Sequence, residues 1–120
     1  GSDTGGSVRI PASFNGLVGL KTTNGQISTA GCVPLSTTLD TLGPIAKTVE
    51  DAWILYSAMT QKPFEKLEPP SHKLNFLIPT TLVFNEIDEE VATAFEDTCK
   101  RLEKQGHQLT RKAVPEFQII

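Results

Sequence analysis

Apolar residues recur every three or four positions in two stretches of this chain, which is the spacing of an amphipathic helix. The first stretch runs from Thr48 to Thr60. Thr48 suits an N-cap, because its hydroxyl can accept a hydrogen bond from a free N–H of the first turn, and Lys62-Pro63 ends the helix. The predicted apolar stripe consists of Val49, Ala52, Leu55, Tyr56 and Met59.

The second helical stretch follows Asp88, which also suits an N-cap, and runs from about Glu89 to Gln105. Gly106 is placed to end it as a C′ residue. One side of this helix carries Val91, Ala94, Phe95, Thr98 and Leu102. Short strands are predicted before and after it, at 74–78 and 108–112. This order predicts a βαβ-like unit with a parallel strand pair.

Residues 1–47 lack such periodicity. They alternate short apolar pieces with Gly, Thr, Ser and Pro, which predicts loops and short strands, and Asn24-Gly25 predicts a turn that could close a hairpin. The prolines and charges of residues 62–73 predict an exposed connector. We therefore divide the chain into a core at 1–61, a connector at 62–73 and a strand-helix-strand unit at 74–120, and assign it to the α/β class.

Composition narrows the functional classes. With 120 residues, 38% apolar and 21% charged, the chain is an ordinary soluble domain with a modest core. A net charge of −3 gives no electrostatic case for nucleic acid or an anionic membrane. Cys32 and Cys99 resemble neither a disulfide framework nor a zinc site, which predicts free thiols in a reducing cytoplasm. No apolar run approaches membrane-spanning length.

The chemistry of the chain concentrates in its first residues, where Gly5 and Gly6 precede Ser7. A glycine turn can aim successive N–H groups into one hollow that favours negative charge, and a serine beside it can act as a nucleophile. The turn is not a phosphate loop, because Gly-Lys-Ser/Thr is absent, and Arg9 stands where a nucleophile elbow needs glycine. The spacing alone favours a structural turn and leaves a catalytic one open.

Longer motifs extend this turn. They are Gly1-Ser2-Asp3-Thr4-Gly5-Gly6-Ser7-Val8-Arg9-Ile10-Pro11-Ala12, Phe14-Asn15-Gly16-Leu17-Val18-Gly19-Leu20-Lys21, Leu39-Asp40-Thr41-Leu42-Gly43-Pro44 and Thr48-Val49-Glu50-Asp51-Ala52. In this order the motifs closely resemble the amidase signature family, over about residues 1–60. The resemblance implies an α/β segment of the amidase signature fold, with a mixed β-sheet core covered by helices.

The resemblance also implies a mechanism. Members hydrolyse amides through a Ser–cis-Ser–Lys triad without a metal or organic cofactor. Ser7 matches the nucleophile, and the N–H groups of Thr4, Gly5, Gly6 and Ser7 match the oxyanion hole. The family's lysine and cis-serine lie before the nucleophile, at positions that nothing in this chain matches, and Lys21 falls outside the triad positions. We therefore expect the chain alone to be inactive.

Other polar residues receive supporting or structural roles. Asp3 and Arg9 flank the serine with opposite charges, which predicts an ion pair that fixes the turn, although contact of Arg9 with a substrate carboxylate stays open. Asp40 is expected to accept hydrogen bonds in a turn or cap, and the family resemblance implies a structural role for it near the site. His72 and His107 are expected to face solvent, and Cys32 is expected to be a packing residue or free thiol.

The resemblance implies that the parent protein cleaves a small-molecule carboxylic amide through an acyl-serine intermediate. It needs the remainder of the amidase domain and has no direct nucleic-acid or membrane partner, and a homodimer of the parent is an open alternative. A second reading is the glutaminase-type subunit of a tRNA-dependent amidotransferase. Ile10 favours a free-standing amidase, because those subunits usually carry glutamine there. A third reading is a non-catalytic interaction module.

Overall fold

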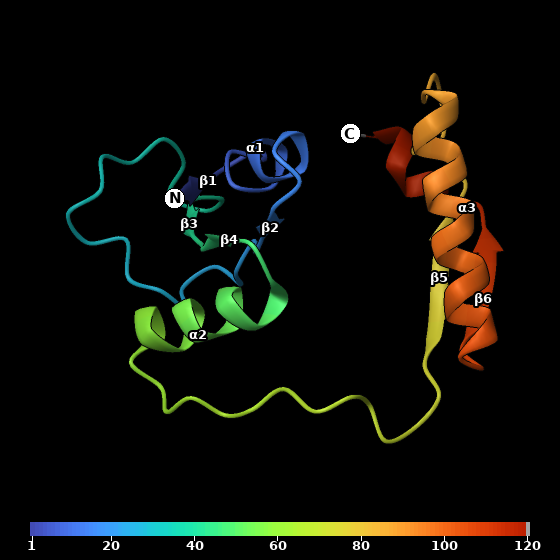
Figure 1. Cartoon of the computed structure of the whole chain (residues 1–120). Coiled ribbons are helices and arrows are strands. Elements are labelled where there is room, and N and C mark those ends of the chain that lie inside the picture. Colours follow the sequence, from blue (N-terminus) through green and yellow to red (C-terminus); the bar gives the residue numbers. More distant parts are fainter. Residues whose placement is uncertain (120) are drawn as a thin grey trace. The chain divides into compact units, whose positions relative to one another are not determined.

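The computed structural model describes residues 1–119, which divide into two compact units (Figure 1). We call residues 1–67 the N-terminal unit and those from Glu68 onward the C-terminal unit. The α/β class predicted from the sequence is confirmed, and antiparallel and parallel strand pairs both occur. The N-terminal unit contains β1 (Ser2–Asp3), α1 (Arg9–Phe14), β2 (Val18–Gly19), β3 (Thr41–Leu42), β4 (Ile45–Ala46) and α2 (Val49–Thr60).

Very short strands join distant parts of the N-terminal unit. β1 pairs antiparallel with β3, so that Asp3 lies opposite Thr41, and β2 pairs antiparallel with β4. Gly1 and Gly43 exchange backbone hydrogen bonds of 2.8 and 2.9 Å beside the first pair. At Gly43, a Cβ atom would lie only 2.0 Å from the carbonyl oxygen of Leu20. The two strand pairs therefore approach so closely that only glycine fits between them.

Helix α1 lies in the region that we predicted to contain only loops and short strands, so this part of the prediction is wrong. Its six residues are too few for a hydrophobic period to be visible in the sequence. Packing holds it in place, because Val8 and Ala12 are fully buried. At Gly19 of β2, a Cβ atom would lie 2.7 Å from the Cβ of Ala12. The helix thus lies directly on the backbone of β2.

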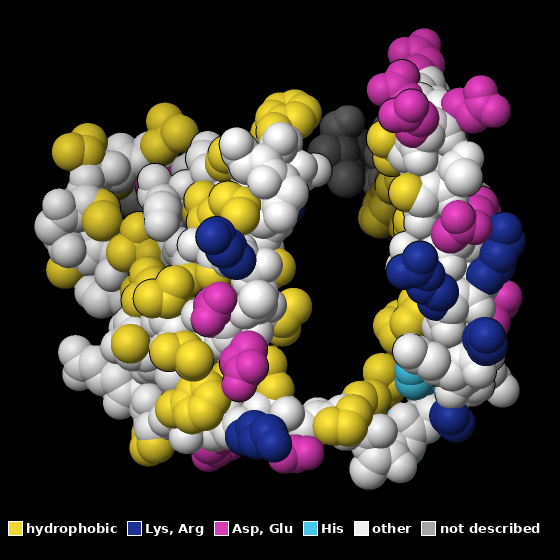
Figure 2. Space-filling model, viewed as in Figure 1, with side chains coloured by type: hydrophobic (Ala, Val, Ile, Leu, Met, Phe, Trp, Pro, Cys, Tyr) yellow, Lys and Arg dark blue, Asp and Glu magenta, His cyan; other side chains and the backbone are white. Residues whose placement is uncertain are grey.

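Helix α2 is confirmed. The Thr48 hydroxyl accepts a hydrogen bond of 3.0 Å from the N–H of Asp51, and Gln61 ends the helix in a left-handed conformation. Its predicted apolar stripe is only partly buried. Ala52 is covered, whereas Val49 and Leu55 are 62% and 44% exposed. Figure 2 shows hydrophobic side chains across the visible face of this unit.

The predicted turn at Asn24-Gly25 is present, with Gly25 at a positive φ of 80°. It does not close a hairpin, because no strand flanks it directly. The chain from residue 20 to residue 40 instead forms a long irregular loop, which runs outward from the unit in Figure 1.

The C-terminal unit follows the predicted βαβ pattern. It contains β5 (Asn75–Pro79), α3 (Glu89–Lys104), β6 (Gln108–Lys112) and a 3₁₀ helix, η1 (Pro115–Ile119). β5 and β6 are parallel, with Asn75 opposite Gln108. Gly106 follows α3 with a φ of 87°, as a C′ glycine should. Cys99, which was not assigned to the apolar side of α3, is buried on it.

Residues 61–73 are all exposed and form no helix or strand, and the division between the units falls inside this stretch. Trp53 of α2 donates a hydrogen bond of 2.7 Å from its indole N–H to the carbonyl oxygen of Glu65. Among the helices of the described residues, none has the length and apolar character needed to cross a membrane.

Candidate active site

A tight turn of residues 4–7 links β1 to α1. It contains the candidate nucleophile Ser7 and is here called the nucleophile turn. Gly6 is buried and has a φ of 142°, and a Cβ atom there would lie 2.6 Å from Cδ1 of Ile10. Both the conformation and the packing therefore require glycine at this position. Gly5 differs, because its φ is ordinary and a Cβ atom would meet nothing within 4 Å. Open space lies beside Gly5.

The buried carboxylate of Asp3 holds the turn from inside. Its Oδ2 accepts hydrogen bonds from the backbone N–H groups of Val8 (3.1 Å) and Arg9 (3.3 Å). Nε and Nη2 of Arg9 each donate to it at 3.1 Å, one to each oxygen, so the expected ion pair is present and bidentate. The Arg9 guanidinium holds the pKa of the Asp3 carboxyl far below its usual range, against the opposing effect of burial.

Lys21 binds the base of the same turn. Its Nζ donates hydrogen bonds to the carbonyl oxygens of Asp3 and Leu39, the latter at 2.8 Å, and lies 3.3 Å from Oδ1 of Asp3. The Thr41 hydroxyl also donates to the carbonyl oxygen of Asp3 at 3.3 Å. This lysine therefore ties β1 to the end of the long loop.

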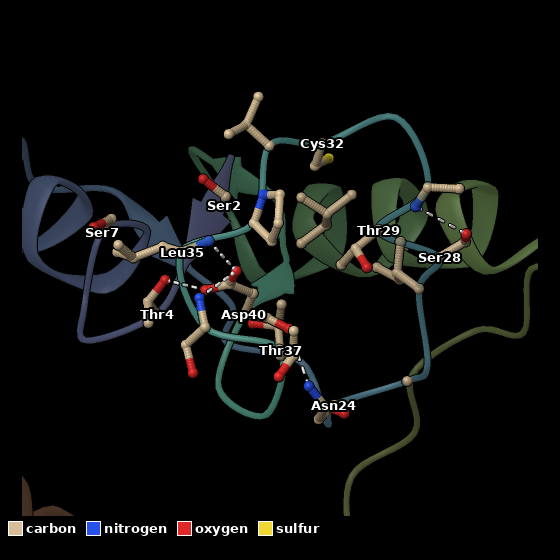
Figure 3. A pocket seen from close by; sticks show the side chains of 18 residues that line it. Ser2, Thr4, Ser7, Asn24, Ser28, Thr29, Cys32, Leu35, Thr37 and Asp40 are labelled. Carbon is tan, nitrogen blue, oxygen red and sulfur yellow. Dashed lines mark hydrogen bonds between the residues drawn. The ribbon is translucent and has the colours of Figure 1, made fainter.

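Ser7 is exposed and lines a pocket of about 580 Å³ (Figure 3). Within residues 1–119, no side chain forms a hydrogen bond with its hydroxyl. Over the same residues, the N–H groups of Gly5, Gly6 and Ser7 donate no hydrogen bond. The pocket is walled by the nucleophile turn, by the β1 and β3 strands and by most of the long loop, including Asn24, Ile27, Ser28, Cys32, Leu35 and Asp40.

Asp40 connects the nucleophile turn to the long loop. Its Oδ1 accepts a hydrogen bond from the Thr4 hydroxyl, and its Oδ2 accepts the N–H groups of Leu35 (2.8 Å) and Ser36 (2.9 Å). These donors, the Thr4 hydroxyl first, lower the pKa of the Asp40 carboxyl. The sequence predicted a turn acceptor here. The contact with Thr4 spans 36 residues and left no local signal.

The remaining predicted residues are dispersed. Cys32 is exposed on the pocket wall, Cys99 is buried, and both are free thiols. His72 is exposed as expected, but the prediction for His107 is wrong. This half-buried ring accepts the N–H of Leu74 at Nδ1 (3.1 Å) and packs edge-on against Phe76. No cluster of His, Cys, Asp and Glu side chains suited to a metal ion occurs in the part of the chain that is described.

The sequence model of the amidase family matches residues 1–120. The chain belongs to the amidase family. Its relatives include the 2-amino-5-chloromuconic acid deaminase of Comamonas testosteroni, which is 40% identical over 96% of this chain and 26% of the relative. A glutamyl-tRNA(Gln) amidotransferase subunit of Thermotoga maritima is 38% identical over 96% of this chain and 27% of the relative.

A solved structure described as a crystal structure of amidase has a similar fold. It superposes with a TM-score of 0.80 at 34% identity, covering 96% of this chain and 26% of that structure's chain. The amidase-family resemblance stated from the motifs is therefore confirmed over nearly the whole chain. The chain spans about a quarter of the length of the curated relatives that it matches.

Proposed function

We propose that the protein carrying this segment hydrolyses a small carboxylic amide, with Ser7 as the nucleophile. One observation carries the proposal. Ser7 opens onto a pocket directly after a turn whose N–H groups at Gly5, Gly6 and Ser7 have no acceptor among residues 1–119. Free N–H groups beside an exposed hydroxyl suit an oxyanion that forms as the hydroxyl attacks a carbonyl.

In the proposed reaction, Oγ of Ser7 bonds to the amide carbonyl carbon while its proton passes to a base. The carbonyl oxygen becomes negative beside the N–H groups of residues 4–7. The C–N bond then breaks, the amine leaves with a proton from the base, and water hydrolyses the acyl-serine to the acid. The base is assigned to the lysine and cis-serine implied by the family resemblance, because no described side chain contacts the Ser7 hydroxyl.

Asp3 and Arg9 are proposed to position the turn. The guanidinium of Arg9 gives two hydrogen bonds to the buried carboxylate of Asp3, which fixes the start of α1 just after Ser7. A substrate carboxylate would have to compete with Asp3 for these donors. The geometry therefore favours the supporting role of Arg9 over direct substrate binding.

The family relatives support a second candidate, the glutaminase-type subunit of a tRNA-dependent amidotransferase. The Thermotoga maritima relative, which is described as part of such an amidotransferase, is nearly as similar to this chain as the deaminase. Ile10 is 53% exposed, and its side chain lies over Gly6. The glutaminase-type subunits usually carry glutamine at the position of Ile10. The free-standing amidase therefore stays the main proposal. Ammonia transfer to a tRNA-linked residue, with co-purifying partner subunits, would select the second candidate instead.

Three further features belong to the proposal. Residues 1–120 are taken as part of one amidase domain, with the core at 1–61, the connector at 62–73 and the strand-helix-strand unit at 74–120. The two free thiols favour a cytoplasmic protein. The proposed partner of the parent protein is a small-molecule amide, and no direct contact of the protein with nucleic acid or a membrane is proposed. A homodimer of the parent is an open alternative.

The test uses a serine-directed fluorophosphonate on the intact parent protein. Ser7→Ala should abolish labelling and reduce amide hydrolysis by at least about 10⁴-fold, because the acyl-serine can no longer form. Ser13→Ala, an exposed serine on α1, is the matched control and should label normally. Labelling that survives Ser7→Ala would overturn the assignment of the nucleophile.

A further inference from the structure

We propose that Asp40 is a positioning residue that couples the long pocket-lining loop to the nucleophile turn. We call its three carboxylate contacts, to Thr4, Leu35 and Ser36, the Asp40 bridge. The catalytic consequence of this bridge rests on the proposed function of Ser7, whereas the coupling itself does not.

The Asp40 bridge connects two parts of the chain that are distant in the sequence. The bridge joins the nucleophile turn, through the Thr4 hydroxyl, to the far side of the loop, through the N–H groups of Leu35 and Ser36, and its bond between Thr4 and Asp40 spans 36 residues (Figure 3). The main chain of Asp40 adds two bonds, from its N–H to the carbonyl oxygen of Ser36 and from the Asn24 amide to its own carbonyl oxygen, both 3.0 Å. Asp40 thus fixes both ends of the loop at one point.

Formation of the turn at Leu35 and Ser36 does not by itself need the bond from Asp40 to Thr4. An aspartate that merely caps the turn at Leu35 and Ser36 uses one oxygen, Oδ2. The other oxygen, Oδ1, is used entirely on Thr4, the first residue of the nucleophile turn. A capping role therefore explains the two hydrogen bonds to Oδ2 and leaves the bond between Oδ1 and Thr4 unexplained.

Neutral groups donate all three hydrogen bonds of the Asp40 bridge. No ion pair to the Asp40 carboxylate occurs among residues 1–119, so neutral donors satisfy it. Hydrogen bonds to an ionised carboxylate are stronger than those between neutral groups. Lys21 instead holds the neighbouring carbonyl oxygen of Leu39 and that of Asp3, which anchors the chain on both sides of the bridge.

The pocket explains why this coupling matters for chemistry. Thr4 and Ser7 of the nucleophile turn and Cys32, Leu35 and Ser36 of the long loop all line it. The Asp40 bridge is a direct polar link between these two parts of the lining. Releasing it should let the loop move and should free Thr4, next to the N–H groups that are proposed to hold the oxyanion. Misplacement of a reacting group by about 1 Å can cost on the order of a hundredfold in rate.

The experiment measures how fast the fluorophosphonate labels Ser7 in the intact parent. Asp40→Ala should slow labelling on the order of a hundredfold, and Thr4→Val on the order of tenfold, because the second change leaves the bonds to Leu35 and Ser36 in place. Thr4→Ser keeps the hydroxyl and should recover most of the rate lost in Thr4→Val. The double variant Asp40→Ala/Thr4→Val should be no slower than Asp40→Ala alone, which a generally damaged fold would not produce.

The controls separate coupling from general damage. Asp97→Asn removes an exposed carboxylate whose one ion pair within residues 1–119 is with Lys100, and should leave labelling unchanged. Amide hydrogen exchange should rise in Asp40→Ala both at 25–39 and at 8–10, whose N–H groups are hydrogen-bonded directly after the nucleophile turn, and should stay normal at 75–79 in the C-terminal unit. Faster exchange confined to 35–36, or additive effects in the double variant, would overturn the coupling.

Failure of the proposed function gives a different result. If the wild-type parent shows no labelling at Ser7, the catalytic assignment fails. The exchange measurement then decides the coupling by itself, because it needs no reaction. Simultaneous loss of protection in the two segments supports the Asp40 bridge, and loss in one segment alone refutes it.

Discussion

The two units of this chain are held together in different ways (Figure 1). In the C-terminal unit, a regular parallel pair of five-residue strands, β5 and β6, is covered by the 16-residue helix α3. In the N-terminal unit, the strands have two residues each, and polar side chains bind backbone groups of distant segments. The N-terminal unit, which contains the candidate active site, is therefore the unit that depends on long-range polar contacts.

This difference has a physical reason. A pocket wall needs exposed backbone N–H groups and irregular loops, which regular helices and sheets do not supply. Such a segment buries little apolar surface, so charged and polar side chains must fix it. Asp3, Lys21 and Asp40 do so around the nucleophile turn. We expect substitutions in the N-terminal unit to act over long sequence distances and those in the C-terminal unit to act locally.

The largest effect is expected from Gly43→Ala. Its Cβ atom would lie 2.0 Å from the carbonyl oxygen of Leu20, so one of the two backbones must move, at a cost of about 3 kcal/mol. Hydrogen exchange in the parent protein should speed up at both β1 and β2, although they are far apart in the sequence. Protection that stays normal at both strands would contradict the close approach.

Asp3→Asn should follow, with a loss of about 2 kcal/mol, because the buried acceptor of Val8 and Arg9 loses its charge. The pKa of Asp3 is lowered in the folded protein, so its contribution is complete above about pH 4 and is lost as the pH falls toward its folded pKa. Urea unfolding from pH 6 to pH 3 should therefore show a steeper loss in the wild type than in the variant. If the unfolding free energy falls equally with pH in the wild type and in the variant, Asp3 does not contribute to the loss of stability in acid.

A smaller effect is expected from Gly106→Ala in the C-terminal unit. Its φ of 87° strains any other residue by about 1 kcal/mol, while the neighbouring Lys73 side chain is flexible enough to move aside. Faster exchange should be limited to the end of α3 and the start of β6. Faster exchange at β1 or α1 would contradict the expectation that substitutions in the C-terminal unit act locally.

The smallest change in stability is expected from Gly5→Ala, below about 0.5 kcal/mol, because its added Cβ atom meets nothing within 4 Å. The same methyl group would project beside the proposed oxyanion site, so labelling of Ser7 should slow. A thermal melt and a labelling rate on one preparation test both halves. Normal labelling with an unchanged melting temperature would argue against the role of Gly5.

Sequence patterns predicted the regular elements because those depend on neighbours. The periodicity around α2 and α3, Thr48 as an N-cap and Gly106 as a C′ residue were all visible locally and are confirmed. α1 was missed, because six residues show no period and burial of Val8 and Ala12 holds it. The structural role of His107 was missed for a related reason, since its partner Leu74 lies 33 residues away in the chain.

The sequence by itself determined the family, the α/β class, helices α2 and α3 and the place of the Gly-Gly-Ser turn, because each of these depends on contiguous residues. The Asp3–Arg9 ion pair was also predicted from the sequence, and only the tertiary structure decided which side chains from distant segments hold that turn. Lys21 reaches the carbonyl oxygens of Asp3 and Leu39, and Asp40 reaches Thr4 across 36 residues. Such contacts depend on the path of the chain in space, for which local propensity and periodicity carry no signal.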